Sequence, residues 1–345
     1  MPINVTKVTR SVPCGPSGFV RLRRIVLVLA LLVSLTACTT IPLGTSELLG
    51  ENDHFAVVLA GEGETYRRLA KTFYRDAAQD WRISDVNGGK PIQPGMVVTV
   101  PKGDDNKIGV WHDGYQTVPI LSYHRFGEGR GRLSVSGEQF ESQMRYLRDN
   151  GYRVVPLEAA AAFFRGERAV PQKSVVLTID DGYQSVYDIA FPILTRYGYP
   201  ATVFIYSDYI GGGGLTWKQM KKMEQSGLVS FQAHSKTHAN LTQRQPGESI
   251  ADYGARLRAE VSAPNEKLSS RMREPVFGYA YPFGAVNRPV VDELKRNGFE
   301  LGATVRRGGN PFFAFPYGLR RTMIYESDSL ADFASALETY ERNGG

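Results

Sequence analysis

The sequence predicts an α/β fold, a distorted barrel of alternating strands and helices that follows a small module of two strands and two helices. From residue 118 onward, continuous apolar runs alternate with amphipathic stretches, which is the pattern of a parallel sheet covered on both faces. The number of such units favours a barrel over an open sheet. A separate strand–helix–helix–strand pattern lies near residues 55–102. The length of 345 residues suits one large and one small domain.

Residues 1–37 predict a secretory signal, because a basic head precedes a short apolar core in RLRRIVLVLALLVSLTAC, which ends at Cys38. The core is too short to span a membrane comfortably. Leu-Thr-Ala-Cys at the predicted cleavage point resembles the lipobox of bacterial lipoproteins. That resemblance implies a lipidated Cys38 anchored in the cell envelope, at the periplasmic face of the outer membrane. An uncleaved membrane anchor is the alternative, and residues 1–20 precede the usual signal layout.

Charge and cysteine content narrow the range of functions and of stabilising features. Removal of residues 1–37 takes the 41 basic residues to 36, against 35 acidic ones. The mature chain is then about neutral, which gives no case for nucleic-acid binding. Cys14 and Cys38 are the only cysteines, so the processed protein has no disulfide and its core must hold the fold.

Residues 38–54 have no clear period and are interpreted as a tether, which reaches roughly 50 Å when fully extended. In the module that follows, FAVVL predicts a strand and TYRRLAKTFYRD a helix with Tyr66, Leu69 and Phe73 on one face. WRISDVNG predicts a second short helix, and PIQPGMVVTVP predicts a turn and a closing strand.

The order of these elements, with GEGETYRRLA, DVNGG and IQPGMVVTVP, resembles the LysM module. The resemblance implies that residues 55–102 bind glycans that contain N-acetylglucosamine, peptidoglycan among them. Gly63-Glu64 stands where the first turn of that module normally has Gly-Asp. A spacer domain without glycan affinity is therefore the alternative.

The segment 103–116 is polar and contains glycine, so we interpret it as a linker before a domain at 117–345. The strands expected in that domain are VPILSY, SVVLTI, ATVFIY, LVSFQA, VFGYAY and ELGATV. The helices are expected at 137–150, 184–197, 217–226, 247–269, 288–297 and 330–342.

Two adjacent carboxylates, Asp180 and Asp181, end one of these strands before Gly182. Active sites of α/β barrels gather at the carboxyl ends of strands, and a turn at the glycine would let both side chains face such a site. The alternative is a pair of solvated turn residues that cap the next helix.

His234 and His238 follow another apolar strand, four residues apart, in a chain that has only five histidines. This spacing can place two metal ligands on one face of a helical turn. A zinc protease needs Glu directly after the first His, and Ser235 stands there. One carboxylate and two histidines leave coordination positions open, and a second carboxylate beside them suits metal-assisted hydrolysis of an amide or ester. A non-haem iron oxygenase site has similar ligands.

DDGY, HSKTH and YPFG, in this order, resemble the polysaccharide deacetylase family, carbohydrate esterase family 4. The similarity runs from about residue 118 to 326 and includes PILSYHRF and LRRTMIY. Two of the motifs occur here in the forms YHRF and AYPFG, which are similar to those of the family branch that removes acetyl groups from poly-N-acetylglucosamine. The resemblance implies a deacetylase-type barrel and a hydrolase that acts on carbon–nitrogen bonds of an N-acetylglucosamine polymer, with one divalent metal ion, most readily Zn²⁺.

The resemblance also implies roles for single residues. It makes Asp180 the general base, and Asp181, His234 and His238 the metal ligands. It places the backbone N–H of Phe283 at the acetyl carbonyl. Tyr183, Tyr281 and Pro282 are expected to contact the sugar.

Two departures from the family pattern give further candidates. Many members have an Arg that pairs with the catalytic aspartate where this chain has Ala280, and Arg321 is the expected replacement. The general-acid His of the family is missing, because no His follows His238. His124 ends the first strand of the barrel and is the expected substitute, with a histidine bonded inside the core as the alternative.

Other functions fit the residues less well. A glycan-binding protein without activity would not need the full ligand set. A glycosidase that uses Asp180 and Asp181 would hold its carboxyls too close for the usual inverting spacing. The run Gly211–Gly214 lacks a lysine at the spacing of a phosphate loop, which argues against a nucleotide site there and favours a mobile loop beside the active site. Peptidoglycan and an exopolysaccharide both remain possible substrates.

Overall fold

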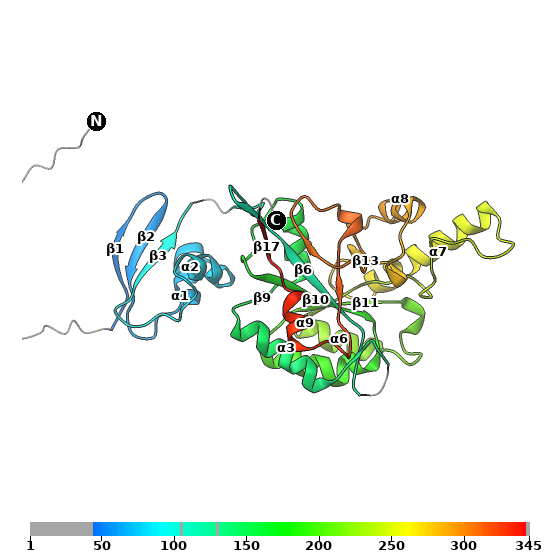
Figure 1. Ribbon diagram of the computed structural model, residues 1–345, viewed down its shortest axis with the longest axis horizontal. Coiled ribbons are helices and arrows are strands. Elements are labelled where there is room, and N and C mark those ends of the chain that lie inside the picture. Colours follow the sequence, from blue (N-terminus) through cyan, green and yellow to red (C-terminus); the bar gives the residue numbers. More distant parts are fainter. Residues whose placement is uncertain (1–43, 104–105, 129–130, 343–345) are drawn as a thin grey trace, which may run out of the picture. The chain divides into compact units, whose positions relative to one another are not determined.

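The computed structural model describes residues 44–103, 106–128 and 131–342 (Figure 1). The predicted signal and the predicted lipidation site Cys38 lie outside these residues. The described residues belong to one compact unit. None of the helices in the described ranges combines the length and the apolar character that a membrane crossing requires.

The N-terminal module is a three-stranded antiparallel sheet covered by two helices (Figure 1). Its elements are β1 (Glu47–Glu51), β2 (Phe55–Leu59), α1 (Tyr66–Tyr74), the short turn η1 (Ala77–Gln79), α2 (Asp80–Val86) and β3 (Val97–Pro101). The order after β2 confirms the expected strand–helix–helix–strand pattern. Strand β1 corrects the prediction of a tether up to residue 54: it pairs with β2, and an exposed edge strand of this kind carries no apolar period.

The ends of the two helices are fixed by local hydrogen bonds. Thr65 caps α1 by accepting from the backbone N–H of Arg68. The side chain of Asn87 donates to the carbonyls of Ile83 and Thr99 and accepts from the N–H of Thr99. Asn87 therefore ends α2 and ties that end to β3, at the Asn-Gly signal from which a helix end is expected.

The large domain is built on a parallel sheet with the order β14-β13-β12-β11-β10-β6. Its strands are β6 (Val118–Tyr123), β10 (Ser174–Asp181), β11 (Ala201–Ile205), β12 (Val229–Ala233), β13 (Gly278–Ala280) and β14 (Leu301–Ala303). The returning chain pairs β16 (Thr322–Met323) with β6 and bridges Leu319 to Ala303 of β14. This segment joins the two edges, so the fold is the distorted α/β barrel that the sequence predicts.

Helices surround this sheet, and most begin and end within three residues of the predicted bounds. They are α3 (Gly137–Asp149), α4 (Leu157–Phe164), α5 (Phe191–Tyr197) after the π-helical turn η2 (Val186–Ala190), α6 (Trp217–Gln225), α7 (Ile250–Ser269), α8 (Arg288–Arg296) and α9 (Leu330–Ser335). Shorter pieces complete the domain: β7 (Arg125–Phe126), β8 (Ser134–Val135), β9 (Arg153–Val154), η3 (Ser207–Tyr209), η4 (Pro282–Gly284), β15 (Gly309–Asn310) and η5 (Pro316–Gly318).

Two predictions about the ends of the domain are wrong. The expected helix at 330–342 is α9 followed by β17 (Tyr340–Arg342), and the expected linker at 103–116 contains β4 (Val110–Trp111) and β5 (Gly114–Gln116). β17 pairs with β5, and β5 pairs with β4, in a separate antiparallel sheet. The pairing is between distant segments, which local periodicity does not register.

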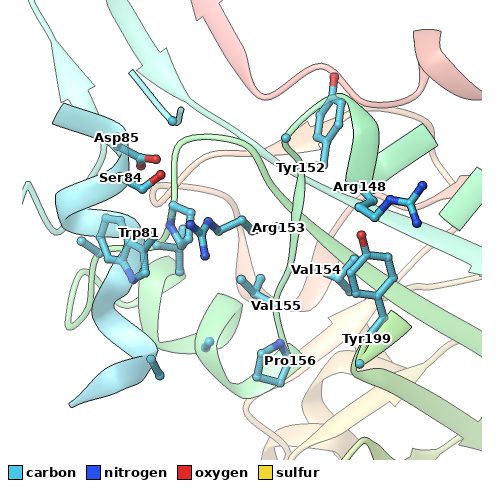
Figure 2. Close-up of a pocket in the computed structure, with 18 of the residues that line it drawn as sticks. Trp81, Ser84, Asp85, Arg148, Tyr152, Arg153, Val154, Val155, Pro156 and Tyr199 are labelled. Carbon is cyan, nitrogen blue, oxygen red and sulfur yellow. The ribbon is translucent and has the colours of Figure 1, made fainter. Parts of the chain in front are cut away.

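The module contacts the large domain near the start of the barrel strands. Asp80 at the beginning of α2 pairs with Arg153 of β9 at 3.0 Å. A pocket of about 710 Å³ lies along this contact, with Trp81, Ser84 and Asp85 on one side and the segment around Arg153 on the other (Figure 2). Because β9 pairs with the first residues of β10, this pocket lies at the opposite end of the strands from Asp180.

Candidate active site

The predicted site residues follow the carboxyl ends of neighbouring parallel strands. Asp180 and Asp181 end β10, His124 follows β6, His234 follows β12, and Tyr281 to Gly284 follow β13. Parallel strands bring these ends to one rim of the barrel. The sheet order therefore gathers residues that are more than a hundred positions apart in the chain.

The turn after β10 allows both aspartates to face the site. Asp181 has φ 73° and Gly182 has φ 79°, so the chain leaves the extended conformation directly after Asp180. A Cβ on Gly182 would lie 2.6 Å from the side chain of Ile205, so a larger residue would not fit there. Both carboxylates are buried, with Asp180 2% and Asp181 6% exposed, which excludes the alternative of solvated turn residues.

The two histidines come together through an irregular loop, and the expected helical turn is wrong. Ser235 and His238 both have positive φ, at 70° and 63°. Ser235 Oγ accepts from the N–H of His238 at 2.8 Å, and the buried Glu260 of α7 accepts from the N–H groups of Lys236 and Thr237 at 3.0 and 2.9 Å. These bonds supply the partners that a helical turn would otherwise provide.

Asp181, His234 and His238 form a compact set of ligands. Asp181 Oδ1 lies 3.6 Å from His234 Nε2 and 3.4 Å from His238 Nε2, and the three ligand atoms lie within 4.8 Å of one another. Within the described part of the chain, Asp181 Oδ1 is buried without a hydrogen-bond partner. One carboxylate and two imidazoles with an unsatisfied inward oxygen fit a divalent transition metal.

Hydrogen bonding and burial prepare His234 as a ligand. Its Nδ1 lies 2.8 Å from the carbonyl of Ala280, which assigns the proton to Nδ1 and leaves Nε2 free to coordinate. Burial lowers the pKa of His234 to about 4. Burial also lowers the pKa of His238. Both rings are therefore neutral near pH 7, as metal ligands must be.

Arg321 binds Asp180 through two parallel hydrogen bonds, as the sequence predicts for a replacement of the family arginine. Nη1 and Nη2 lie 2.7 and 2.8 Å from the two carboxylate oxygens. Arg321 is fully buried, and its Nε donates to the carbonyl of Thr304. Burial alone would raise the pKa of Asp180, but the positive charge of Arg321 and its hydrogen bonds hold that pKa well below its usual value.

His124 lies beside the same carboxylate. Its Nε2 is 3.9 Å from Asp180 Oδ2, and the residue is 8% exposed. Its Nδ1 is buried and has no hydrogen-bond partner in the ranges that the structure describes. Burial lowers the pKa of His124, and the negative charge of Asp180 opposes that shift.

The Tyr281–Gly284 segment exposes the ring of Phe283 and buries both of its predicted sugar contacts, Tyr281 and Pro282. Phe283 has φ 60°, is 65% exposed and stands with its ring centroid 4.7 Å from that of His238. Tyr281 is a correction: its ring is buried and its hydroxyl donates to the carbonyl of Tyr317. Pro282 is also buried, so neither offers surface to a sugar.

Three residues near the site were missed from the sequence. Ser122 Oγ lies 3.4 Å from Asp180 Oδ2, Glu260 holds the histidine loop, and the ring of Tyr206 lies 5.5 Å from that of His238. Ser122 is a polar residue inside an apolar strand and Glu260 an acid within the buried face of a helix. Both are signals that sequence inspection can detect.

Comparisons with known proteins agree with this geometry. Residues 167–302 match the family model for polysaccharide deacetylases. The Bacillus subtilis (strain 168) protein YxkH, assigned as a polysaccharide deacetylase, is 29% identical over 69% of this chain and 82% of its own length. The poly-β-1,6-N-acetyl-D-glucosamine N-deacetylase of Escherichia coli (strain K12) is 25% identical over 67% of this chain, which spans only 39% of that enzyme.

The fold is also similar to that of solved deacetylase structures. The Streptococcus pyogenes deacetylase PplD, solved in complex with acetate, superimposes with a TM-score of 0.59 and 26% identity, over 65% of this chain and 99% of that structure. The region that matches the polysaccharide deacetylase model, residues 167–302, lies within the α/β barrel that carries the candidate site.

Proposed function

We propose that this protein is a metal-dependent hydrolase that removes N-acetyl groups from an N-acetylglucosamine polysaccharide at a bacterial cell surface. One observation carries the proposal: a fitting metal-ligand set lies beside a buried Asp–Arg pair and a histidine, at the rim of a deacetylase barrel. Acetate and a free amine on the sugar are the expected products.

Asp181, His234 and His238 would hold the metal ion, with zinc as the expected occupant because zinc ranks high in affinity for such ligands. When bound, the metal supplies Lewis acidity toward the acetyl carbonyl and toward a water molecule. The backbone N–H of Phe283 would donate to the same carbonyl oxygen.

Asp180 is the base in this proposal, and His124 is the group that returns the proton to the leaving amine. Arg321 keeps Asp180 ionised and fixes both of its oxygens, so the carboxylate is oriented before the substrate arrives. His124 Nε2 lies within 4 Å of Asp180, which allows a short path for the proton.

The named relatives favour an exopolysaccharide of the poly-β-1,6-N-acetylglucosamine type as the substrate. We further propose that residues 55–102 bind peptidoglycan as a LysM-like module and that a lipid on Cys38 holds the protein at the periplasmic face of the outer membrane. Replacement of Cys38 by Ser should then abolish incorporation of labelled fatty acid.

The activity is tested by incubating the purified protein with poly-β-1,6-N-acetylglucosamine and, separately, with peptidoglycan. Acetate release and mass spectrometry of the sugars are the measurements. Loss of acetyl groups from one polymer, abolished by a chelator and restored by Zn²⁺, supports the proposal. If the metal-loaded protein deacetylates neither polymer, the proposed function is wrong.

A further inference from the structure

An arc of aromatic rings extends away from the metal-ligand set. The ring of Tyr206 lies 5.5 Å from that of His238 and stacks on Tyr209 at 4.9 Å with an interplanar angle of 14°. Tyr209 meets Tyr183 edge to face at 5.6 Å. The guanidinium of Arg125 covers the ring of Tyr183 at 3.9 Å. We call Tyr183, Tyr206 and Tyr209 the aromatic wall; all three are partly exposed.

The glycine run next to the wall determines where two of these tyrosines stand. A Cβ on Gly214 would lie 2.5 Å from Cδ1 of Tyr209 and 2.9 Å from the carbonyl of Gly182. Gly213, with φ 115°, also packs against the Tyr209 ring. Gly214 forms a β-bridge with Tyr183, and Leu215 donates to the carbonyl of Gly182.

These contacts give the glycine run a structural purpose. Two of its members have no side chain because the ring of Tyr209 occupies the space that a Cβ would need. The segment is thereby attached to the turn that carries Asp181 and Tyr183. A conformation held this closely at the rim of a site indicates a surface that is shaped for a ligand.

We propose that the aromatic wall, held by Gly213 and Gly214, is a subsite for a sugar unit next to the one that is deacetylated. This inference rests on the proposed function. Tyr206 is the wall residue that contacts a ligand histidine, and Tyr209 lies one ring further out, so the unit over Tyr209 is a neighbour of the reacting unit. The chemistry that fits is the apolar face of a pyranose ring on partly exposed tyrosines, with phenol groups as hydrogen-bond partners.

The groups around the wall support a neutral hexosamine unit. The phenol groups of the wall can donate to sugar hydroxyls or to an acetamido carbonyl. Arg125 covers one ring of the wall, and a cation there disfavours a neighbouring unit that already carries an ammonium group. The wall therefore suits a unit that still has its acetyl group.

The test compares a long and a sugar-free substrate in variants of the wall. The probes are a β-1,6-linked N-acetylglucosamine pentamer and an aryl acetate ester, which presents an acetyl group without any sugar. Tyr209→Ala should raise KM for the pentamer roughly fivefold to tenfold and lower the ratio of pentamer to ester kcat/KM by a similar factor. Tyr209→Phe should recover most of that ratio, since the stacking face is kept.

Gly214→Ala should reproduce the Tyr209→Ala effect, because its methyl group displaces the ring. Gly212→Ala is the matched control in the same run: its Cβ would meet nothing closer than 3.7 Å, and it should behave as wild type. Zinc content is measured in every variant, so that damage to the metal site is recognised.

An unchanged pentamer-to-ester ratio in Tyr209→Ala, in protein with full zinc content, would overturn the subsite. So would equal losses on both substrates. A wild-type protein that hydrolyses the ester but not the polymer would instead refute the proposed function, and the two failures are therefore distinguishable.

Discussion

The two carboxylates at the end of β10 are adjacent in the chain but differ in their surroundings. Asp180 is neutralised by Arg321 at 2.7 Å, and its pKa is lowered despite burial. Among the described residues, no arginine or lysine forms an ion pair with Asp181, and burial raises its pKa. A bound cation would supply the missing charge at Asp181. The difference supports the assignment of Asp180 as base and Asp181 as ligand.

Replacement of Asp180 by Asn should leave metal binding intact and abolish nearly all turnover. The amide keeps the shape of the side chain but cannot take a proton, and general-base catalysis contributes about 10²- to 10⁴-fold. Zinc content and the rate of acetate release are the two measurements. If the variant loses its zinc, the roles of Asp180 and Asp181 are the reverse of those proposed.

Replacement of His124 by Ala should fold, bind zinc and lower the deacetylation rate by roughly 10²-fold or more. The pH dependence of kcat/KM should also lose its basic limb, which in wild type should lie below the ordinary His value because burial lowers the pKa of this ring. Unfolding of the variant at ordinary temperature would show a core role. An active variant with an unchanged pH profile would show that another group protonates the amine.

At the scale of elements, the loop between β12 and α7 depends on one buried acid. Glu260 accepts from two backbone N–H groups and from the hydroxyl of Thr237. The loop has two residues with positive φ, so it needs these external partners to keep both histidines in place.

Glu260→Ala should therefore weaken zinc binding by about 10- to 100-fold, the usual effect of losing support for metal ligands. It should also destabilise the fold by about 1 kcal/mol, because two partly buried backbone N–H groups lose their acceptor. Glu260→Gln, which keeps a carbonyl oxygen for the backbone groups, should retain most of the affinity. Competition with a chelator measures the zinc affinity of each variant. An unchanged zinc affinity in Glu260→Ala would contradict the role of Glu260 in holding the two histidines.

The elements that the sequence predicts well are those with a strong local pattern. Fully buried strands such as β6 and β10 are apolar runs, and the polar residues directly after them identify the rim of the barrel. Helix α4 was missed because it is apolar on nearly every face and shows no period. The prediction of one helix over 330–342 is wrong in its second half. A capping box at Ser329 starts a real helix, but β17 forms by pairing with a strand more than 200 residues away.

The site could be predicted only in part for similar reasons. Residue types and order indicate Asp180, Asp181, His234 and His238, but the left-handed backbone at Asp181, Ser235 and His238 carries no signal of its own. The aromatic wall needs three segments to meet, so its tyrosines are unremarkable in the sequence. Tyr281 was predicted as a sugar contact because it belongs to the YPFG motif, but its ring is buried in the core.

For the whole molecule, contacts between module and barrel are modest in strength. The Asp80–Arg153 pair is partly exposed, and such pairs contribute about 0 to 1 kcal/mol. The rim of the barrel buries His124 and His234 and partly buries His238, and each of the three has a lowered pKa. Buried neutral histidines make the stability of a protein depend on pH.

The metal-free protein should lose stability as the pH falls from about 6.5 toward 4. The folded-state pKa of His234 is about 4 and the ordinary value is 6.5, so between these values the unfolded chain binds the additional proton. Stability is therefore full above the unfolded pKa and falls as the pH falls. Over the whole window the difference for His234 amounts to about 3 kcal/mol.

Urea unfolding of chelated protein at pH 7 and pH 5 measures this loss, and His234→Gln is the control because the amide does not titrate. The wild type should lose more stability between the two pH values than the variant does. Zinc at pH 7 should stabilise the wild type further, since it binds only the folded state with neutral ligands. Equal losses in both proteins would mean that His234 is not held neutral by burial, and its assignment as a prepared metal ligand would be wrong.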